Sequence, residues 1–408
     1  MRLGSPGFMG SRLVEAREAR GFTATRIADL ISVKKQSVSQ WEHGQQTPHP
    51  DHLDRLSAVL NLPKSFFFRK RSPGRERIVF YRSLSSATKS ARIRAERRYS
   101  WLRDIVTYLE GFFEFPKVSF PSFALPREVT DITDDSIEII AGECREFWAL
   151  GNDPVPDITL LLENSGGICS RMAFEADTLD SFSEWALNES RPFFVLGSDK
   201  GNAFRSRMDA AHELGHIILH RHISKADFQS SAKFKRVEQQ AFRFASAFLL
   251  PAEQFCSEIW APTLDAFLAL KPRWKVAVAA MLMRSQQLGI VEGEYARRLW
   301  MTLGRYGWKR KEPLDDEEAV ERPRLLRRSI EMLLTDGNLS AAQILAYLRL
   351  SPLDIEEIAN LTQGTLSQER AQVIKLPKFI GREPVQEFDL DDRSNVIPFG
   401  RNQRPIID

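Results

Sequence analysis

The sequence predicts a mostly helical α+β protein with three parts. These are a five-helix N-terminal unit, a middle domain with a small sheet, and a helical C-terminal region. Apolar residues recur at helical spacing through most of the chain, and only short apolar segments between residues 167 and 197 have the character of strands. At 408 residues the chain is long enough for two to three domains.

The composition is that of a globular protein, with 43% hydrophobic and 27% charged residues. No apolar run approaches the roughly 20 residues of a membrane span, and the N-terminal segment lacks the hydrophobic region of a signal peptide. The three cysteines, Cys144, Cys169 and Cys256, are widely separated, which favours buried thiols over a disulfide framework. We therefore expect a cytoplasmic protein with no membrane partner.

Charge is distributed unevenly along the chain. Residues 1–110 hold 21 Lys and Arg against 10 Asp and Glu, a local net charge of +11, so the remainder carries −8. A basic N-terminal quarter on an acidic body predicts a module that binds a polyanion at that end.

The N-terminal unit, residues 1–70, is predicted to hold its five short helices within Ser11–Phe68. Thr23 suits the N-cap of the second helix. A short turn at residues 32–34 then leads to a third helix over residues 36–44, which is the arrangement that reads DNA. Val38 and Trp41 take inward positions on it. The outer face and first turn offer side chains suited to bases and phosphates: Lys34, Lys35, Gln36, Ser37, Ser39 and Gln40.

The stretch VSQWEHGQQTP, followed by LDRLSAVLNLP, resembles the XRE/Cro-type helix-turn-helix family. The resemblance covers about 60 residues and implies binding to double-stranded DNA. One departure is Ala24, where the family often has Gln. A helix-turn-helix unit that binds only protein remains the alternative.

Residues 71–115 are expected to form a basic linker and an amphipathic helix from about Ala87 to Phe113. Tyr99, Leu102 and Val106 keep helical spacing on its apolar side. Its arginines either extend the phosphate footprint or form a solvated face; they are Arg92, Arg94, Arg97 and Arg98.

Helices are predicted next at Thr133–Leu150 and Thr159–Ser165, and strands at Gly167–Met172 and Pro192–Gly197, with a turn at Ser183–Trp185. A short sheet beside a metal-binding helix could hold an extended peptide by strand addition.

The sequence His212-Glu213-Leu214-Gly215-His216 lies inside an apolar helical run. Residues four apart share a helix face, so both imidazoles could bind one Zn²⁺ and Glu213 could reach a water molecule there. A second helical pattern begins near Val237 and ends at Pro251, with Glu238 at its head. Glu238 could add a carboxylate to the two imidazoles, which is the ligand set of an open catalytic zinc site. The plain alternative is a helix that happens to carry two histidines.

These motifs, HELGH and then EQQAFRFASAFLLP, together with the lead-in FRSRMDAA, resemble the ImmA/IrrE family of bacterial metallo-endopeptidases. The resemblance spans roughly residues 75–310, with the peptidase domain at 116–310. It implies a zincin-like fold, zinc on His212, His216 and Glu238, and Glu213 as general base. Where the family often has Asn, this chain has Phe242. Candidates for stabilising the oxyanion are Arg205, Arg207, His220 and Tyr306.

The resemblance also implies a protein substrate: a helix-turn-helix repressor or similar regulator, cleaved in a stress, mobile-element or phage-defence response. The expected partners are then double-stranded DNA and that substrate, with a homodimer as a further possibility. The rival hypothesis is a transcriptional repressor or antitoxin-like protein whose zinc domain is a sensor or scaffold.

The C-terminal third is predicted to be helical over Leu264–Gly307. A C-terminal helical region, residues 311–365, follows, with an acidic linker at Glu312–Glu321 and a helical unit at Leu325–Leu361. Residues 366–408 hold few periodic apolar residues and are expected to form a flexible tail.

Overall fold

The computed structural model describes residues 4–70, 88–176, 179–185, 190–199, 201–223 and 230–367. These described residues belong to one compact unit. The predicted tail lies outside the described residues, apart from Leu366 and Ser367. The predicted class is confirmed: the described chain is mostly helical, with a small three-stranded sheet. None of the described helices is both long enough and apolar enough to cross a membrane.

The N-terminal unit contains the five helices expected from the sequence. They are α1 (Gly10–Ala19), α2 (Ala24–Leu30), α3 (Lys35–Glu42), α4 (Pro50–Leu60) and the 3-10 helix η1 (Lys64–Phe68). The Thr23 side chain accepts a hydrogen bond from the Arg26 backbone N–H at 3.1 Å, which confirms it as the N-cap of α2. Val38 and Trp41 of α3 are buried against this unit, as predicted.

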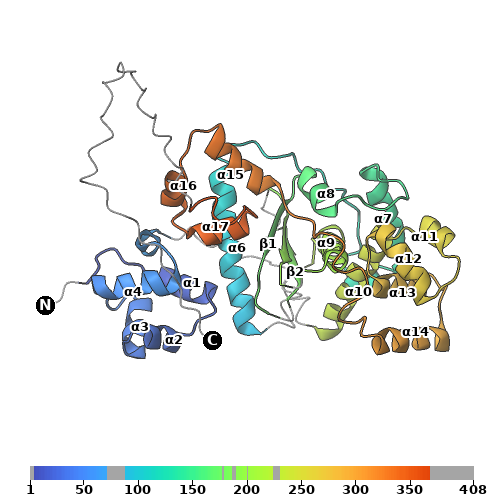
Figure 1. Ribbon diagram of the computed structural model, residues 1–408, viewed down its shortest axis with the longest axis horizontal. Coiled ribbons are helices and arrows are strands. Elements are labelled where there is room, and N and C mark those ends of the chain that lie inside the picture. The colour runs from blue at the N-terminus through green and yellow to red at the C-terminus, as the bar shows by residue number, and fades with distance from the viewer. Residues whose placement is uncertain are drawn as a thin grey trace, which may run out of the picture. The chain divides into compact units, whose positions relative to one another are not determined.

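Helix α6 (Lys89–Leu109) packs against the N-terminal unit and the sheet (Figure 1). On one side Trp101 is fully buried, and its indole N–H donates to Glu15 of α1 at 2.9 Å. On the other side the Tyr99 ring packs edge-on against Phe182 and Phe193. Helix α6 therefore joins the N-terminal unit and one face of the sheet in a single hydrophobic core.

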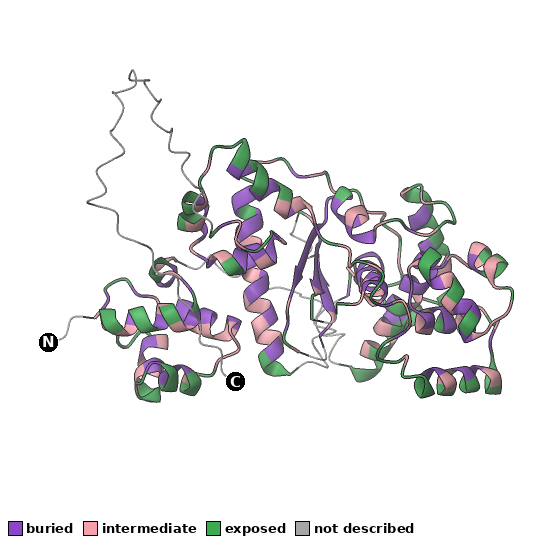
Figure 2. Ribbon diagram, viewed as in Figure 1, coloured by how far each residue is buried: buried purple, intermediate pink, exposed green. Residues whose placement is uncertain are grey.

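The sheet contains β1 (Ile168–Met172), β2 (Ser181–Glu184) and β3 (Phe193–Gly197) in the order β1-β3-β2. Strand β1 is parallel to β3, and β2 is antiparallel to it. Figure 2 shows the strands buried along almost their whole length, which requires cover on both faces. Among the described strands, β3 is central and β1 and β2 are the two edges.

The period-two alternation of the strands divides the interior into two hydrophobic cores. One face packs toward α6 and the N-terminal unit through Ile168, Met172, Phe182, Phe193 and Val195. The other packs toward the helices that follow the sheet through Cys169, Phe194 and Leu196.

Strand β2 corrects the prediction of a turn at Ser183–Trp185. Ser181 and Ser183 alternate with Phe182, which faces α6, so the segment is a genuine strand with one polar face. That polar face can be buried because the serine hydroxyls donate hydrogen bonds to a carboxyl side chain on the neighbouring helix, described below.

The helices between α6 and the C-terminal region are η2 (Val129–Asp131), α7 (Asp134–Phe147), α8 (Ile158–Asn164), α9 (Ala203–Leu219), α10 (Ser231–Leu249), α11 (Ala252–Glu258), α12 (Leu264–Trp274), α13 (Val278–Gln287) and α14 (Gly293–Arg305). Among them, α8 and α9 contact the sheet. Helix α10 ends just before Pro251, as predicted.

The C-terminal helices are α15 (Leu325–Thr335), α16 (Ala341–Leu348) and α17 (Pro352–Ile358). They join the core that contains α6 and the N-terminal unit. Arg20, the C-cap residue of α1, forms a two-pronged ion pair with Asp354 of α17, both bonds being 2.6 Å.

The acidic segment at Glu312–Glu321 is not a free linker. Buried Lys271 contacts Glu312 at 2.9 Å and Asp315 at 2.6 Å, and Glu312 also accepts the first backbone N–H groups of α13. The acidic composition of this segment is typical of a linker, but its buried partner Lys271 lies some 40 residues earlier in the chain.

Candidate metal centre and DNA-reading helix

Helices α9 and α10 approach closely beneath the candidate metal centre. Asn202 caps the start of α9 by accepting from the Arg205 backbone N–H at 3.0 Å. A Cβ added to Gly215 would lie 3.1 Å from the Ala241 carbonyl oxygen and from the Phe244 ring. A small residue at position 215 therefore lets the two backbones come together.

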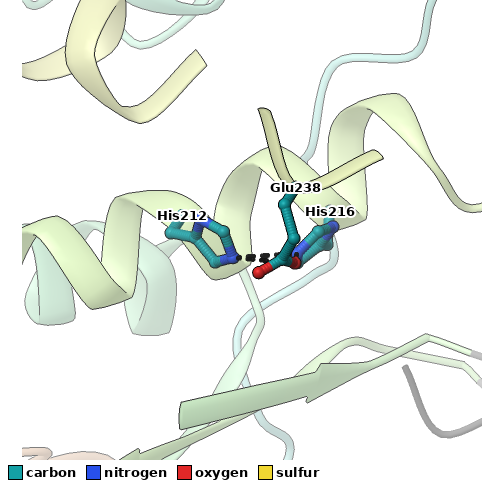
Figure 3. A group of neighbouring side chains, drawn as sticks. All are labelled: His212, His216 and Glu238. Carbon is teal, nitrogen blue, oxygen red and sulfur yellow. Dashed lines mark hydrogen bonds and ion pairs between the residues drawn. The ribbon is translucent and has the colours of Figure 1, made fainter. Parts of the chain in front are cut away.

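This packing brings three predicted ligands into one cluster. In Figure 3, His212 and His216 project from successive turns of α9, and Glu238 reaches them from α10. His216 Nε2 lies 3.0 Å from His212 Nε2. Glu238 Oε1 lies 3.7 Å from His212 Nε2 and 3.6 Å from His216 Nε2. The two histidines are buried, whereas the Glu238 side chain is 28% exposed, although its ligand atom Oε1 is itself buried.

The spacing of these atoms suits a single small cation. Ligand atoms bound to one tetrahedral Zn²⁺ at about 2.0–2.1 Å lie about 3.3 Å from one another. The three observed separations, 3.0, 3.6 and 3.7 Å, fall on either side of that value. Two imidazoles and one carboxylate are also the donor set of catalytic zinc sites.

Glu213 lies beside the cluster and is almost completely buried. Both of its carboxylate oxygens accept hydrogen bonds from strand β2, Oε1 from the Ser181 hydroxyl and Oε2 from the Ser183 hydroxyl, each at 2.7 Å. Sequence reasoning missed both serines because it placed no strand there. Their two-residue spacing was the available signal, since it puts both hydroxyls on one face of a strand.

The candidates for oxyanion stabilisation lie in different surroundings. The Arg205 guanidinium donates to the Lys309 carbonyl at 2.7 Å, and buried Arg207 pairs with Glu321. Tyr306 is exposed on the end of α14. His220 is fully buried and contacts His216 instead of solvent.

A groove of about 430 Å³ lies along α10 next to the cluster. Phe242 lines it, and the same ring packs against His212 with centroids 4.2 Å apart. Arg243 also lines it and pairs with Glu138 of α7, which in turn pairs with Arg284. Burial would raise the pKa of Glu138, but the two arginines outweigh it and lower that pKa.

The predicted DNA-reading residues lie together on α3 and its first turn. Lys34, Lys35 and Gln36 are exposed. Ser37, Ser39 and Gln40 are half-buried on the same helix. This leaves one polar helix face available to a duplex.

Three of the four arginines predicted on the exposed side of α6 pair with carboxylates of the same chain. Arg94 pairs with Glu175 at 2.6 Å and Arg97 with Glu18 at 2.7 Å, while Arg98 is buried and pairs with Glu357. Neither alternative from the sequence, a phosphate-binding face or a solvated face, included these ion pairs. Their carboxylate partners lie far away in the sequence, so the pattern of charges alone could not reveal the pairs.

Comparison with known proteins defines the class of each region. Residues 13–67 match the helix-turn-helix family, and residues 169–286 match the IrrE N-terminal-like domain. The fold and the matches together describe a regulator-type DNA-binding domain fused to a metallopeptidase-like domain. The chain thus joins an XRE-type helix-turn-helix domain to an ImmA/IrrE-like peptidase-family domain.

A curated relative resembles the N-terminal part. The SPbeta prophage-derived uncharacterized HTH-type transcriptional regulator YonR of Bacillus subtilis (strain 168) is 28% identical over 60 residues. The alignment covers 15% of this chain and 56% of the relative, so this chain spans about half the length of the curated protein that it matches.

Proposed function

We propose that this protein is a cytoplasmic DNA-binding regulator whose ImmA/IrrE-like domain is a zinc-dependent endopeptidase. Its proposed substrate is a helix-turn-helix repressor or a similar regulatory protein, cleaved in a stress, mobile-element or phage-defence response. One observation carries the proposal: His212, His216 and Glu238 offer ligand atoms that all lie within 4.8 Å of one another. Glu213 follows the first of these ligands directly in the chain.

The chemistry divides between the ion and the chain. A zinc ion held by the three ligands would polarise a water molecule and the scissile carbonyl. Glu213 would accept a proton from that water and pass it to the leaving amine. Ser181 and Ser183 hold the Glu213 carboxylate in one orientation, so the base is positioned before substrate arrives.

Two features support a polypeptide substrate. Strand β2 lies at the edge of the described sheet, so an extended peptide could pair with it and run past Glu213. The groove lined by Phe242 could take a side chain of that peptide beside His212. Both features lie next to the ligand cluster.

The rival function is a repressor or antitoxin-like regulator whose zinc domain is a sensor or scaffold. The burial of Glu213 and its two hydrogen bonds to β2 favour this rival, because a carboxylate so engaged also cross-links α9 to the sheet. The two functions differ in whether the Glu213 charge is needed for turnover.

The deciding experiment is Glu213→Gln in the full chain. The variant keeps the size of the side chain and its capacity for hydrogen bonds to both serines, so fold, metal content and DNA binding should persist. Cleavage of a co-expressed helix-turn-helix protein encoded by a neighbouring gene, followed on a gel, should fall by about 10²–10⁴-fold. A reporter on the target promoter should be derepressed by the wild type alone. Equal regulation by both proteins would support the scaffold function instead.

A further inference from the structure

We propose that His220 and Gln240 are positioning residues that set the tautomer of His216, so that its Nε2 lone pair faces the metal. The proposal rests on the zinc site proposed above and assigns it an outer layer of hydrogen bonds. Five groups form a continuous series of contacts: the backbone carbonyls of Val129 and Ile132 and the side chains of Gln240, His220 and His216.

The orientation of the Gln240 side-chain amide is unambiguous. Its Nε2 donates to two backbone carbonyl oxygens, that of Val129 at 2.6 Å and that of Ile132 at 3.0 Å. Carbonyl oxygens can only accept, so the NH₂ group must face them and Oε1 must face the opposite way. Gln240 is completely buried, so the amide is held in this orientation.

His220 receives the other end of that amide. Its Nε2 lies 3.0 Å from Gln240 Oε1, and its Nδ1 lies 2.9 Å from His216 Nδ1. Because Oε1 has no hydrogen, His220 Nε2 must carry the proton and donate. In a neutral imidazole the other nitrogen then accepts, so His220 Nδ1 accepts from His216 Nδ1–H.

As a consequence, the Nε2 atom of His216 carries no proton. A neutral His216 with its proton on Nδ1 presents a lone pair at Nε2, the atom that faces His212 and Glu238. The opposite polarity would place a proton on Nε2, where it would block metal binding. Hydrogen bonds to the far nitrogen of a metal-ligating histidine commonly set its tautomer and orientation.

The series of hydrogen bonds from Gln240 through His220 to His216, called the relay below, also explains the position of His220 on the helix. It is the C-cap residue of α9, four residues after His216, and its ring turns inward. His222, two residues later, is exposed. The two histidines therefore have different roles, although both lie at a helix C-terminus where a cation would be favourable.

The first test measures the tautomer directly. Full-length protein with ¹⁵N-labelled histidine, stripped of metal by a chelator, would be studied by ring ¹⁵N–¹H correlation spectra. We expect His216 to carry its proton on Nδ1 and His220 on Nε2 before any metal is added. A proton on His216 Nε2 in the folded, metal-free protein would overturn the proposal.

The second test compares two variants of similar size. His220→Asn can place its amide oxygen toward His216 Nδ1–H, whereas His220→Leu offers no acceptor. Zinc affinity, measured by competition with a chromophoric chelator, should fall about 10–100-fold in His220→Leu and be largely restored in His220→Asn. His222→Leu makes the same change at the exposed histidine and should bind zinc like the wild type. Circular dichroism checks that each variant is folded.

The outcomes separate this proposal from the one on which it rests. If the wild type binds no zinc, the metal site itself is wrong. If the wild type binds zinc and His220→Leu binds it equally well, the site stands and the relay is wrong. Equal losses in His220→Asn and His220→Leu would also reject the relay, since the retained acceptor would then have no effect.

Discussion

The Ser183 hydroxyl donates a hydrogen bond of 2.7 Å to Glu213 Oε2 and thereby ties the edge strand β2 to helix α9. Ser181 makes the equivalent bond to Oε1 from two residues earlier. Strand β2 and Glu213, the proposed general base, are thus connected by two buried hydrogen bonds. A substrate strand paired with β2 would be aligned with the same carboxylate.

Removing one of these hydroxyls should be unusually destabilising. Ser183→Ala leaves a buried carboxylate oxygen without this donor, and hydrogen bonds to charged groups contribute about 1.5–3 kcal/mol. Ser170→Ala is a matched control in the same sheet, because the Ser170 hydroxyl donates to the neutral carbonyl of Ile358 at 2.7 Å. Its cost should be about 1 kcal/mol. Denaturant unfolding of both variants makes the comparison, and equal losses would argue that Glu213 is uncharged.

Metal analysis tests the ligand cluster. The purified full chain should contain one zinc ion, and Glu238→Ala should lose most of it because two imidazoles alone leave the coordination shell incomplete. Gln239→Ala, at the next, exposed position of α10, is the control and should keep the metal. Wild-type zinc content in Glu238→Ala would exclude this carboxylate as a ligand.

The polar face of α3 should bind duplex DNA with a steep dependence on salt, since each phosphate contact releases counterions. Lys35→Ala should weaken binding to all sequences, whereas Gln36→Ala should relax the sequence preference. Lys309→Ala removes the same charge from an exposed position outside the helix-turn-helix domain and serves as the control. Footprinting on the region upstream of the gene is the measurement. Absence of protection at low salt would favour a helix-turn-helix unit that binds only protein.

A pH effect on stability should arise at Glu163. Burial raises its pKa to about 7, even though the backbone N–H groups of Arg324 and Leu325 donate to its carboxylate and favour the charged form. The folded chain keeps this proton up to about pH 7, while the unfolded chain releases it near 4.5. The Glu163 contribution to the free energy of unfolding should therefore fall as pH rises through that window, by up to about 1.4 kcal/mol per unit.

Glu163→Gln should reduce that slope, because the variant cannot ionise. Denaturant midpoints of wild type and variant between pH 4.5 and 8 would show the difference, with Glu143→Gln at an exposed position of α7 as the control. Identical slopes for all three proteins would mean that Glu163 titrates alike in both states.

Local patterns in the sequence predicted much of this protein. The helices of the N-terminal unit, the Thr23 cap, the end of α10 at Pro251 and the buried strands β1 and β3 all follow from spacing and capping within a few residues. The sharing of one helix face by His212 and His216 is equally local, because a helix repeats every 3.6 residues. Such features depend on contacts between near neighbours in the chain.

Only the tertiary structure decided the contacts between distant segments. The sequence offered Arg94, Arg97 and Arg98 as a basic helix face, but they pair with Glu175, Glu18 and Glu357. It likewise could not show that Ser181 and Ser183 contact Glu213, or that His220 contacts both Gln240 and His216. Helical periodicity places a side chain on a face, but the partner opposite that face depends on how whole elements pack. The tertiary structure therefore determined which of the polar side chains became buried partners and which remained available to a ligand.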